Sequence, residues 1–500
     1  MRRLVLPSAL ALVGGCTVGP DYKGPPAAAS QAVDRGTFVR ARDPALSATP
    51  GLARWWEALG DPTLDALVQD ALAHNPSLDQ ASARIREAEA QLRQQRAARL
   101  PSASATGQYL YAELPGVGLG APGGGSGGNG GQDGAGDGGT ALEFYNVGLN
   151  VSWEIDLFGG GRRGVEQARA TAAAREADLA DAQVSLSAQV AQAYVALRDI
   201  QARIRLNAES TRLQQQQLAL TRQRVDRGTA SRLQLERLQN QLENTEAEAI
   251  PLGAQRDEQL NLLAVLTGQA PGAVDTMLAA DAPVPLPPAT VPIGNPAALI
   301  AQRPDIRAAE RQLAAATAGV GVNKAKELPG ISFMGLLGLG GTKPGDIFDL
   351  GNLTTLIAPS LNWSFLDFGR ARAATRASEA QRDSAEAGYR QAVLEALQEA
   401  ETALSRFGST RAQLGRFAQA EATANRAAAL NRQRVEAGTT TVIDQLDVER
   451  QRIAAAAAVA QAKAQLTQSY IAINKALGLG WRAPNPNGGA GRQTPGAALR

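Results

Sequence analysis

The sequence has almost none of the residues on which most catalytic and metal sites depend. Its 500 residues include one cysteine and one histidine. A single cysteine excludes a disulfide within the chain, and the two residues together cannot form a Cys/His zinc cluster. A Ser-His-Asp or Cys-His mechanism would have to use His74, which has no nucleophile motif beside it and is expected to be structural. We therefore expect a chain that is not an enzyme and that binds no metal or cofactor.

Charge and aromatic content exclude further classes of protein. Charged residues make up 20% of the chain and the formal net charge is +2, which argues against nucleic-acid binding. Aromatic residues make up only 4%. Abundant alanine beside so few aromatic residues favours long helices packed closely side by side over a bulky central core.

Long hydrophobic runs are also missing after the first 15 residues. No stretch of about 18 apolar residues occurs there, so no transmembrane helix is expected. Only helices and closed barrels satisfy their backbone groups in lipid. If this chain crosses a membrane, it must therefore do so as a β-barrel.

The N-terminus has the pattern of a lipoprotein leader. Residues 1–15 contain Arg2, Arg3, an apolar stretch and then small residues, as in a secretory signal peptide. The only cysteine, Cys16, follows directly, where lipoprotein processing needs it, so we predict that Cys16 carries a covalent lipid. The alternative is a soluble exported protein whose leader happens to end near a cysteine. Thr17 in place of an aspartate resembles the outer-membrane sorting class of lipoproteins, and a triacylated cysteine would anchor the chain firmly.

One segment alternates strictly between apolar and polar residues, and it predicts a strand that faces lipid. From 145 to 157 the odd positions are apolar, Trp153 among them, and the even positions are polar or glycine. This alternation is longer than an average soluble strand and contains the about 9–11 residues that span an outer membrane. The segment 353–365 repeats the phase, although Leu356, Ala358 and Pro359 blur it, and Pro359 loses one ladder hydrogen bond. The alternative is a β-sandwich strand with one buried face.

Each alternating segment has an upstream partner and an aromatic residue near its end. We expect strands at about 102–114 and 142–157 in the first pair, and at about 331–340 and 353–365 in the second. Trp153 and Trp363 occupy the same relative place, as membrane-interface aromatics would. The Gly-rich loop 115–140 includes a formal GxGxxG, but no strand-turn-helix surrounds it, and we expect a disordered, solvent-facing loop. Four strands cannot close a barrel, since about eight is the small end, so the chain must oligomerise.

The chain repeats itself with an offset of 210 residues. Trp153 recurs as Trp363, Gly228 as Gly438 and Gly268 as Gly478. Each copy reads as a strand pair, a long helix without proline, a turn and a returning helix, which indicates an elongated, pseudo-symmetric molecule.

The long helices are expected at 162–225 and 370–435, where apolar residues recur at heptad spacing. Each ends at a glycine suited to positive φ, Gly228 or Gly438, and a second helix returns. We expect the Pro251-Leu252-Gly253 sequence to break the first returning helix. An isolated coiled-coil stalk is the alternative, but it does not explain why each long helix begins where a strand ends.

These signals predict a division of the chain into sequential parts. They are a signal peptide, an extended N-terminal segment, a first repeat with its tip near 224–232, a Pro-rich linker, a second repeat with its tip near 434–442, and a disordered tail. The predicted ranges are 1–15, 16–60, 61–268, 269–295, 296–480 and 481–500.

Several motifs, taken in order, resemble one family. They are Gly15-Cys16-Thr17-Val18-Gly19-Pro20-Asp21-Tyr22, Trp55-Trp56, Asp61-Pro62-Thr63-Leu64, and Arg303-Pro304-Asp305-Ile306-Arg307-Ala308-Ala309-Glu310. Together they are similar to the outer-membrane factor lipoproteins of the NodT-type branch of the TolC family. The resemblance covers about residues 16–480.

The resemblance implies a homotrimer in the outer membrane. Four strands from each chain would form one 12-stranded barrel, continued by a helical tunnel in the periplasm. Such channels are passive ducts for drugs, metals or other small solutes; an inner-membrane transporter, commonly of the RND type, supplies the energy, and a periplasmic adaptor docks at the helical tips. The tip residues implied here are Arg224, Arg227, Gly228, Thr229, Arg434, Gly438 and Thr439.

The resemblance also implies a narrow periplasmic entrance. Asp444 and Asp447 stand where the family places inward-pointing acids, and a threefold axis would make rings of three carboxylates. The first repeat has Gln234 at the matching position. The alternative is a solvated helix face on which Asp447 pairs with Arg450.

Two other functions stay open. One is the outer-membrane component of type I protein secretion; the other is a structural lipoprotein that spaces the envelope. The polar even-numbered face of residues 146–156 favours a channel, since a spacer needs no wet interior.

Overall fold

The computed structural model describes residues 17–114 and 140–481. The predictions for Cys16, for nearly all of the Gly-rich loop and for the tail lie outside these residues. The chain forms two compact units. Unit 1 comprises residues 1–24, 88–171 and 313–384, and unit 2 comprises residues 25–87, 172–312 and 385–500. Each unit therefore draws on both sequence repeats, and the units do not follow the predicted sequential boundaries.

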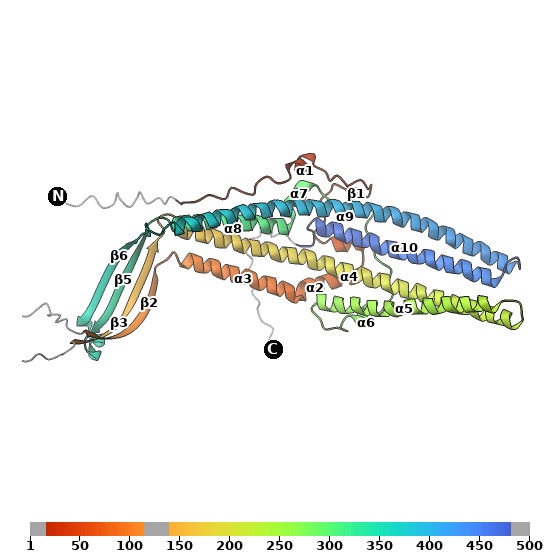
Figure 1. Cartoon of the computed structure of the whole chain (residues 1–500), viewed down its shortest axis with the longest axis horizontal. Coiled ribbons are helices and arrows are strands. Elements are labelled where there is room, and N and C mark those ends of the chain that lie inside the picture. Colours follow the sequence, from red (N-terminus) through yellow and green to blue (C-terminus); the bar gives the residue numbers. More distant parts are fainter. Residues whose placement is uncertain (1–16, 115–139, 482–500) are drawn as a thin grey trace, which may run out of the picture. The chain divides into compact units, whose positions relative to one another are not determined.

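Unit 1 contains one antiparallel sheet of four strands in the order β2-β3-β5-β6 (Figure 1). The strands are β2 (Ser102–Leu114), β3 (Thr140–Ile155), β5 (Gly330–Gly341) and β6 (Leu353–Asn362). Two short 3₁₀ helices, η3 (Pro344–Phe348) and η4 (Leu350–Asn352), join β5 to β6. Within the described residues β2 and β6 are the edges of this sheet, and neither has a second partner.

Three of the four strands lie within two residues of their predicted ends, but β6 is shorter than expected. It stops at Asn362, so Trp363 and Phe365 follow the strand instead of belonging to it. The register explains the difference. Asn362 pairs with Gly330, and the next residue opposite Trp363 would be Pro329, which has no N–H to donate.

The register gives the sheet two chemically different faces. One face is mostly apolar: it carries Ala105, Leu149 and Leu337 in one row, Ala103, Val151 and Ile357 in the next, and then Trp153 beside Phe333 and Ile155 beside Ile331 and Leu361. The opposite face is polar over most of β2 and β3, where it carries Ser102, Ser104, Thr106, Gln108, Asn146, Asn150, Ser152 and Glu154. In β5 and β6 it is mixed: Ser332 and Ser360 share it with Met334, Leu336, Leu356 and Ala358. The predicted alternation is thus strict in β3, while Leu356 and Ala358 blur it in β6 as the sequence indicates.

Four helices connect the sheet to the rest of the chain. Chain segments leave α3 (Pro76–Ala97) and α8 (Pro304–Ala325) to enter β2 and β5, whereas α4 (Gly160–Asp226) and α9 (Arg370–Glu436) follow β3 and β6. Both α4 and α9 contain 67 residues. The returning helices α5 (Arg232–Leu266) and α10 (Val442–Ala476) both contain 35 residues. This agreement in length between the two copies matches the 210-residue repeat.

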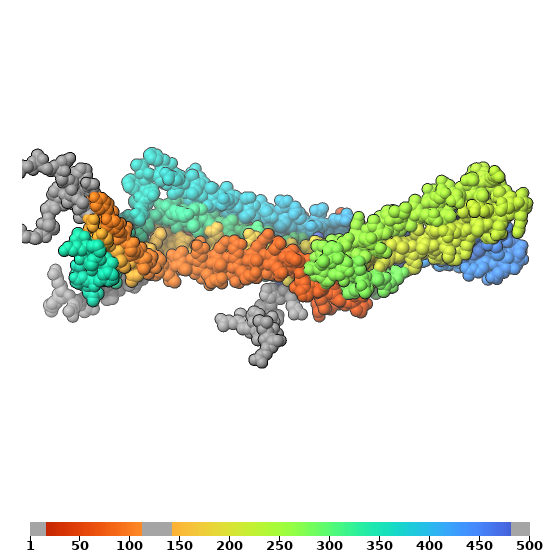
Figure 2. All heavy atoms as spheres, turned by 90° about the horizontal axis from the view of Figure 1, so that it is seen from below, coloured from red at the N-terminus to blue at the C-terminus, as the bar shows by residue number. Residues whose placement is uncertain are grey.

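In unit 2 the α4–α5 hairpin lies beside the α9–α10 hairpin (Figure 2). The core contains large side chains from several elements, including Trp55, Tyr194, Leu197, Phe407 and Tyr470. The smaller elements of this unit are α1 (Ser30–Arg35), β1 (Leu46–Ser47), η2 (Trp55–Leu59), α2 (Pro62–His74), α6 (Asp275–Leu278), β4 (Val291–Pro292) and α7 (Pro296–Gln302). Asp61 caps α2 through the N–H groups of Thr63 and Leu64.

The predicted break at Pro251 is wrong, because α5 continues through it. Proline removes one helical hydrogen bond and disfavours the preceding turn, at about 3 kcal/mol. Here Ile250 and Pro251 lie on the exposed side, while Leu242, Leu252 and Leu263 are buried along the helix. Packing on both sides of the proline therefore holds one continuous helix.

Candidate functional site

The two hairpin tips have the same backbone geometry. At the first tip, Gly228 has φ of 74°, its N–H donates to Val225 O at 2.9 Å, and Thr229 N–H donates to Arg224 O at 2.8 Å. This is a Schellman motif, in which glycine takes the left-handed position. Gly438, with φ of 71°, and Thr439 repeat both bonds to the matching carbonyls at 2.9 Å. The predicted positive φ at both glycines is confirmed.

Asp444 has a local role at the second tip. Its carboxylate accepts hydrogen bonds from the Thr441 N–H at 3.1 Å and the Thr441 hydroxyl at 2.7 Å, and the Thr440 hydroxyl also donates at 3.0 Å. The first of these bonds completes a capping box at the start of α10. Hydrogen bonds from Thr441 hold the pKa of Asp444 below its ordinary value. The exposed side chain therefore stays ionised at the tip.

Asp447 lies one turn further along α10 and is half-buried. Gln217 on α4 donates to it at 3.2 Å, and Arg450 lies 3.9 Å away on the same helix. The i,i+3 pair of the alternative reading is therefore present, but it is long and of the kind that contributes little stability. A role for Asp444 or Asp447 in a channel wall stays a prediction.

A charged network beside Asp447 escaped the sequence analysis. Glu449 is buried, and its carboxylate accepts from Arg452 Nε at 2.6 Å, Arg432 Nη2 at 2.9 Å and Gln445 Nε2 at 3.0 Å. Arg452 also donates to Glu209 on α4 at 2.6 Å. Burial raises the pKa of Glu449, but the hydrogen bonds from Arg452 and Arg432 outweigh it and leave the pKa lowered. The network joins α9, α10 and α4.

The network could have been found by comparing the two sequence repeats position by position. With the 210-residue offset, Glu449 and Arg452 correspond to Gln239 and Leu242. The second hairpin thus carries a pair of opposite charges where the first carries none. Charges that break an otherwise close repeat indicate a contact that only one copy makes.

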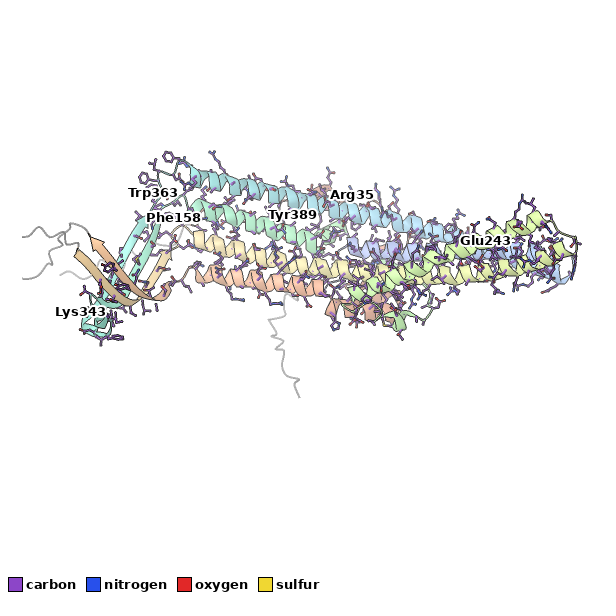
Figure 3. All side chains as sticks on the ribbon, turned by 60° about the horizontal axis from the view of Figure 1, so that its bottom comes forward. Arg35, Phe158, Glu243, Lys343, Trp363 and Tyr389 are labelled. Carbon is purple, nitrogen blue, oxygen red and sulfur yellow. The ribbon has the colours of Figure 1, made fainter. Side chains whose placement is uncertain are left out.

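The predicted interface tryptophans both make a structural hydrogen bond. Trp153 Nε1 donates to Arg99 O at 3.1 Å, and Trp363 Nε1 donates to Glu327 O at 3.3 Å. Each acceptor lies just after the helix that feeds the neighbouring strand, so each indole ties a strand end to a helix end. Figure 3 labels Trp363 near the end of β6 and Phe158 near the end of β3. Their placement at a membrane boundary stays a prediction.

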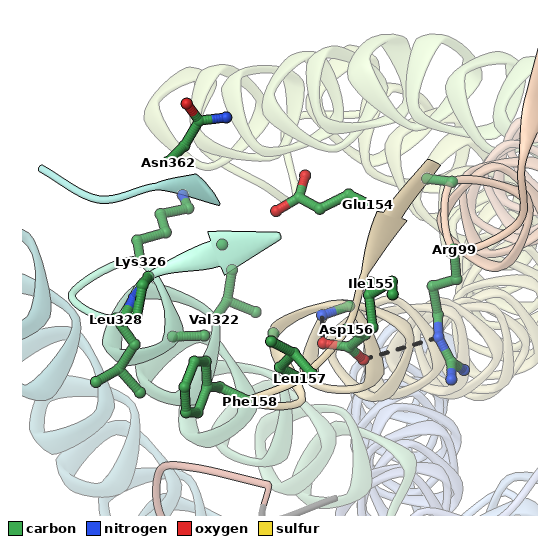
Figure 4. Close-up of a pocket in the computed structure, with 16 residues that line it drawn as sticks. Arg99, Glu154, Ile155, Asp156, Leu157, Phe158, Val322, Lys326, Leu328 and Asn362 are labelled. Carbon is green, nitrogen blue, oxygen red and sulfur yellow. Dashed lines mark hydrogen bonds and ion pairs between the residues drawn. The ribbon is translucent and has the colours of Figure 1, made fainter. Parts of the chain in front are cut away.

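The β3–α4 junction encloses a cavity of about 370 Å³ (Figure 4). Asp156 lies on one side and accepts from the N–H groups of Gly161 at 3.0 Å and Arg162 at 2.8 Å, so it caps α4. Arg99 lies 3.9 Å from the same carboxylate. Apolar residues from this junction and from the segment that leads out of α8 also line the cavity; they include Leu157, Phe158, Ala325, Leu328 and Pro329.

The segment that follows the predicted lipidation site is fastened at this junction. Val18 N–H donates to Phe158 O at 3.0 Å. The Arg163 guanidinium, with only 5% of its side chain exposed, donates to Val18 O at 3.2 Å and lies 2.5 Å from Asp21. Gly19 and Gly321 approach so closely that a side chain on Gly19 would collide with the backbone. Sequence reasoning missed Arg163, because its partners lie more than 140 residues away.

His74, on which a Ser-His-Asp or Cys-His mechanism would depend, makes a local contact within its own helix. His74 lies at the exposed end of α2, with Nδ1 2.7 Å from Asp70 Oδ1. Within residues 17–114 and 140–481, no three His, Cys, Asp or Glu side chains are placed to hold a metal ion.

None of the helices in the described ranges is both long enough and apolar enough to span a membrane.

Comparisons with known proteins agree on one kind of protein. The family model described as outer membrane efflux protein matches residues 67–269 and 295–479. The chain is 31% identical over 500 residues to the pyoverdine export outer membrane protein OpmQ of Pseudomonas aeruginosa, with 97% of this chain and 98% of that protein covered. It is 29% identical over 478 residues to nodulation protein T of Rhizobium leguminosarum bv. viciae, with 95% and 92% covered.

Solved structures show the same likeness. The outer-membrane channel OprN superposes with a TM-score of 0.82 at 33% identity, covering 93% of this chain and 100% of that one. The open state of the MtrE outer membrane channel of Neisseria gonorrhoeae superposes with a TM-score of 0.74 at 25% identity, covering 93% and 98%.

Proposed function

The chain belongs to the outer membrane efflux protein family, and we propose that three copies of it close into the exit duct of a tripartite efflux system. It is an outer-membrane channel component of an efflux system, and it reaches from the outer membrane into the periplasm. Members of the family are channel proteins rather than enzymes. Its relatives include an antibiotic efflux component and a toluene efflux component of Pseudomonas putida.

The two-faced sheet is the observation that carries the trimeric duct. An apolar face suits lipid, and the opposite face suits water most clearly in β2 and β3, where it consists mainly of Ser, Thr, Asn and Gln. The sheet has two unpaired edge strands, β2 and β6. In lipid the backbone N–H and C=O groups along these edges would have no hydrogen-bond partner. Adjacent strands alternate in direction, so β6 of one copy fits antiparallel beside β2 of the next. Three copies would then supply twelve strands. Two copies would supply only eight, which is about the number found in the smallest barrels.

The hairpins supply the periplasmic part of the duct in this proposal. A helix of 67 residues extends about 100 Å at roughly 1.5 Å per residue. The tips around Gly228 and Gly438 would receive a periplasmic adaptor, which connects the duct to an inner-membrane transporter of the RND type. The same rigid Schellman turn at both tips supports this assignment, since one adaptor motif could bind either tip.

Two finer features complete the proposal. Rings of Asp444 and Asp447 would narrow the entrance and favour cations; the ionised, exposed Asp444 carboxylate supports this role. A lipid on Cys16 would anchor the duct, supported by the clasp of Arg163 on the segment that begins at Thr17. Drugs, metals or other small solutes are the proposed cargo, because an exit duct does not select as an inner-membrane pump does.

One preparation tests the central proposal. The full chain is extracted from outer membranes in mild detergent, its oligomer mass is measured, and the same sample is inserted into planar bilayers. A trimer that conducts ions as a water-filled pore is the expected result. A monomer, or a trimer without conductance, would favour an envelope-spacing role instead.

A further inference from the structure

The second strand-to-helix junction exposes an apolar patch that the first junction does not have. We call the patch the β6–α9 patch; it consists of Phe365, Leu366 and Phe368, whose exposed fractions are 77%, 70% and 93%. Phe158 corresponds to Phe368 with the 210-residue offset, but Phe158 is half-buried. Phe368 also has φ of 53°, one of two positive values at non-glycine residues in the described part of the chain. A strained, fully exposed phenylalanine calls for a partner.

The β3–α4 junction indicates which kind of segment packs near such apolar residues. Leu157 and Phe158 line the same cavity as Leu328 and Pro329, which lead from α8 into β5. This arrangement follows from the sheet order, because β5 is the strand beside β3. At this junction the residues that follow β3 thus share a cavity with the Leu-Pro sequence that enters the neighbouring strand, β5.

β6 is an edge strand, so within the described residues no neighbouring strand brings a Leu-Pro sequence to its end. Leu100-Pro101 is the Leu-Pro sequence that leads from α3 into β2, and β2 is the opposite edge of the sheet. Leu100 is 65% exposed, whereas its counterpart Leu328 is half-buried. The chain therefore carries both halves of a second junction cavity, one on each edge, and a single sheet cannot bring them together.

We propose that a second copy of this chain completes the cavity, with the β6–α9 patch of one copy packed against Leu100 and Pro101 of the next. This placement rests on the proposed ring of chains, in which β6 of one copy pairs with β2 of its neighbour. The contact is head-to-tail, and repetition closes the ring only when every copy contributes both halves. It gives the barrel-to-helix boundary one equivalent cavity after every second strand.

Cysteine crosslinking in outer membranes tests the contact. Leu100→Cys combined with Phe368→Cys is treated with a short bismaleimide and run on a denaturing gel. Crosslinked dimers and trimers are expected from the double variant, and neither single variant should exceed the background set by Cys16. The matched control, Leu328→Cys with Phe158→Cys, should crosslink within one chain and migrate as a monomer. Efficient crosslinking of the control with monomer alone from the test pair would overturn the proposal.

The other occupant of the patch is the bilayer, and a second measurement separates the two. A fluorophore on Phe368→Cys should be shielded from nitroxide-labelled lipids, whereas one on Ile357→Cys, on the apolar face, should be quenched strongly. Equal quenching at both positions would assign the patch to lipid and overturn the contact between copies.

A substitution without crosslinker extends the test. Phe368→Gly should lower by several degrees the temperature at which the detergent-solubilised oligomer dissociates. Phe348 in η3 is 85% exposed, and Phe348→Gly should leave that temperature unchanged. Oligomer mass and conductance of the same samples distinguish the two levels of argument. A conducting trimer that never crosslinks contradicts only this contact, and the absence of both oligomer and conductance contradicts the duct as well.

Discussion

Single residues decide how the two hairpins of unit 2 are joined. Glu449 is buried and accepts hydrogen bonds from Arg432, Arg452 and Gln445. Arg452 also donates a hydrogen bond to Glu209 of α4. Arg432 is 64% exposed and Arg452 28% exposed, so solvent screens part of the attraction. Even so, the Glu449 carboxylate accepts three hydrogen bonds from side chains of α9 and α10, and removing its charge should loosen the packing of these two helices.

Glu449→Gln should therefore weaken the link between α10 and its neighbours. We expect a loss of about 1–2 kcal/mol in the local opening free energy, because two charge-assisted hydrogen bonds become weaker. Amide hydrogen exchange along α9 and α10 would then accelerate about tenfold. Glu243→Gln is the matched control, since Glu243 is an exposed acid on α5 that accepts only from Gln239 (Figure 3). Equal exchange rates in the two variants would show that the network contributes nothing.

Acid should mimic the substitution. The pKa of Glu449 in the folded chain is lowered from 4.5. A lowered pKa stabilises the folded state fully above the unfolded value and loses that contribution as the pH falls through the folded value. The protection factors of the α9–α10 hairpin, which divide out the intrinsic exchange rate at each pH, should thus fall below about pH 4.5 in the unmodified chain and depend less on pH in Glu449→Gln.

At the scale of elements, the periodic patterns predicted what depends on one segment alone. The helices α4 and α9 and the alternation of β3 follow from their own side chains, and so do the turns at Gly228 and Gly438. The failures needed knowledge of a partner: β6 ends where Pro329 would face it, and α5 survives Pro251 because leucines on both sides are buried. No local pattern contains either fact.

Replacing glycine by alanine should change the stability of the α9–α10 hairpin in opposite directions at the tip and inside α9. Gly438 has positive φ and open space around its Cα, so Gly438→Ala is opposed by backbone strain alone, at about 1 kcal/mol. Gly415 lies inside α9 and is equally open, so Gly415→Ala should stabilise by about 0.5–1 kcal/mol. Amide hydrogen exchange in α9 is the measurement: faster near the tip in the first variant, slower around residue 415 in the second. Two shifts of the same sign would mean that the tip glycine is not held in the left-handed conformation.

At the scale of the whole molecule, the sequence motifs were enough to predict the family, and the repeat was enough to predict matching hairpins. They could not place Arg163, Glu449 or the exposed Phe368, because each depends on segments that meet only after folding. The assignment of the acidic residues to a channel entrance is likewise a property of an assembly. A test of it must change charge without disturbing the chain that carries it.

Asparagine substitution meets that condition better than alanine. Thr440 and Thr441 donate to one oxygen of Asp444, and Gln217 donates to Asp447, and an amide oxygen can accept the same bonds. The double variant Asp444→Asn with Asp447→Asn should therefore keep the cap of α10 and remove six negative charges from a trimer. Its ratio of cation to anion permeability in planar bilayers should fall several-fold, since rings of carboxylates favour cations. Glu243→Gln removes a charge from α5 and should leave the ratio unchanged. If the double variant conducts with unaltered selectivity, the two aspartates act only at the surface of α10, and the entrance must be narrowed by other residues.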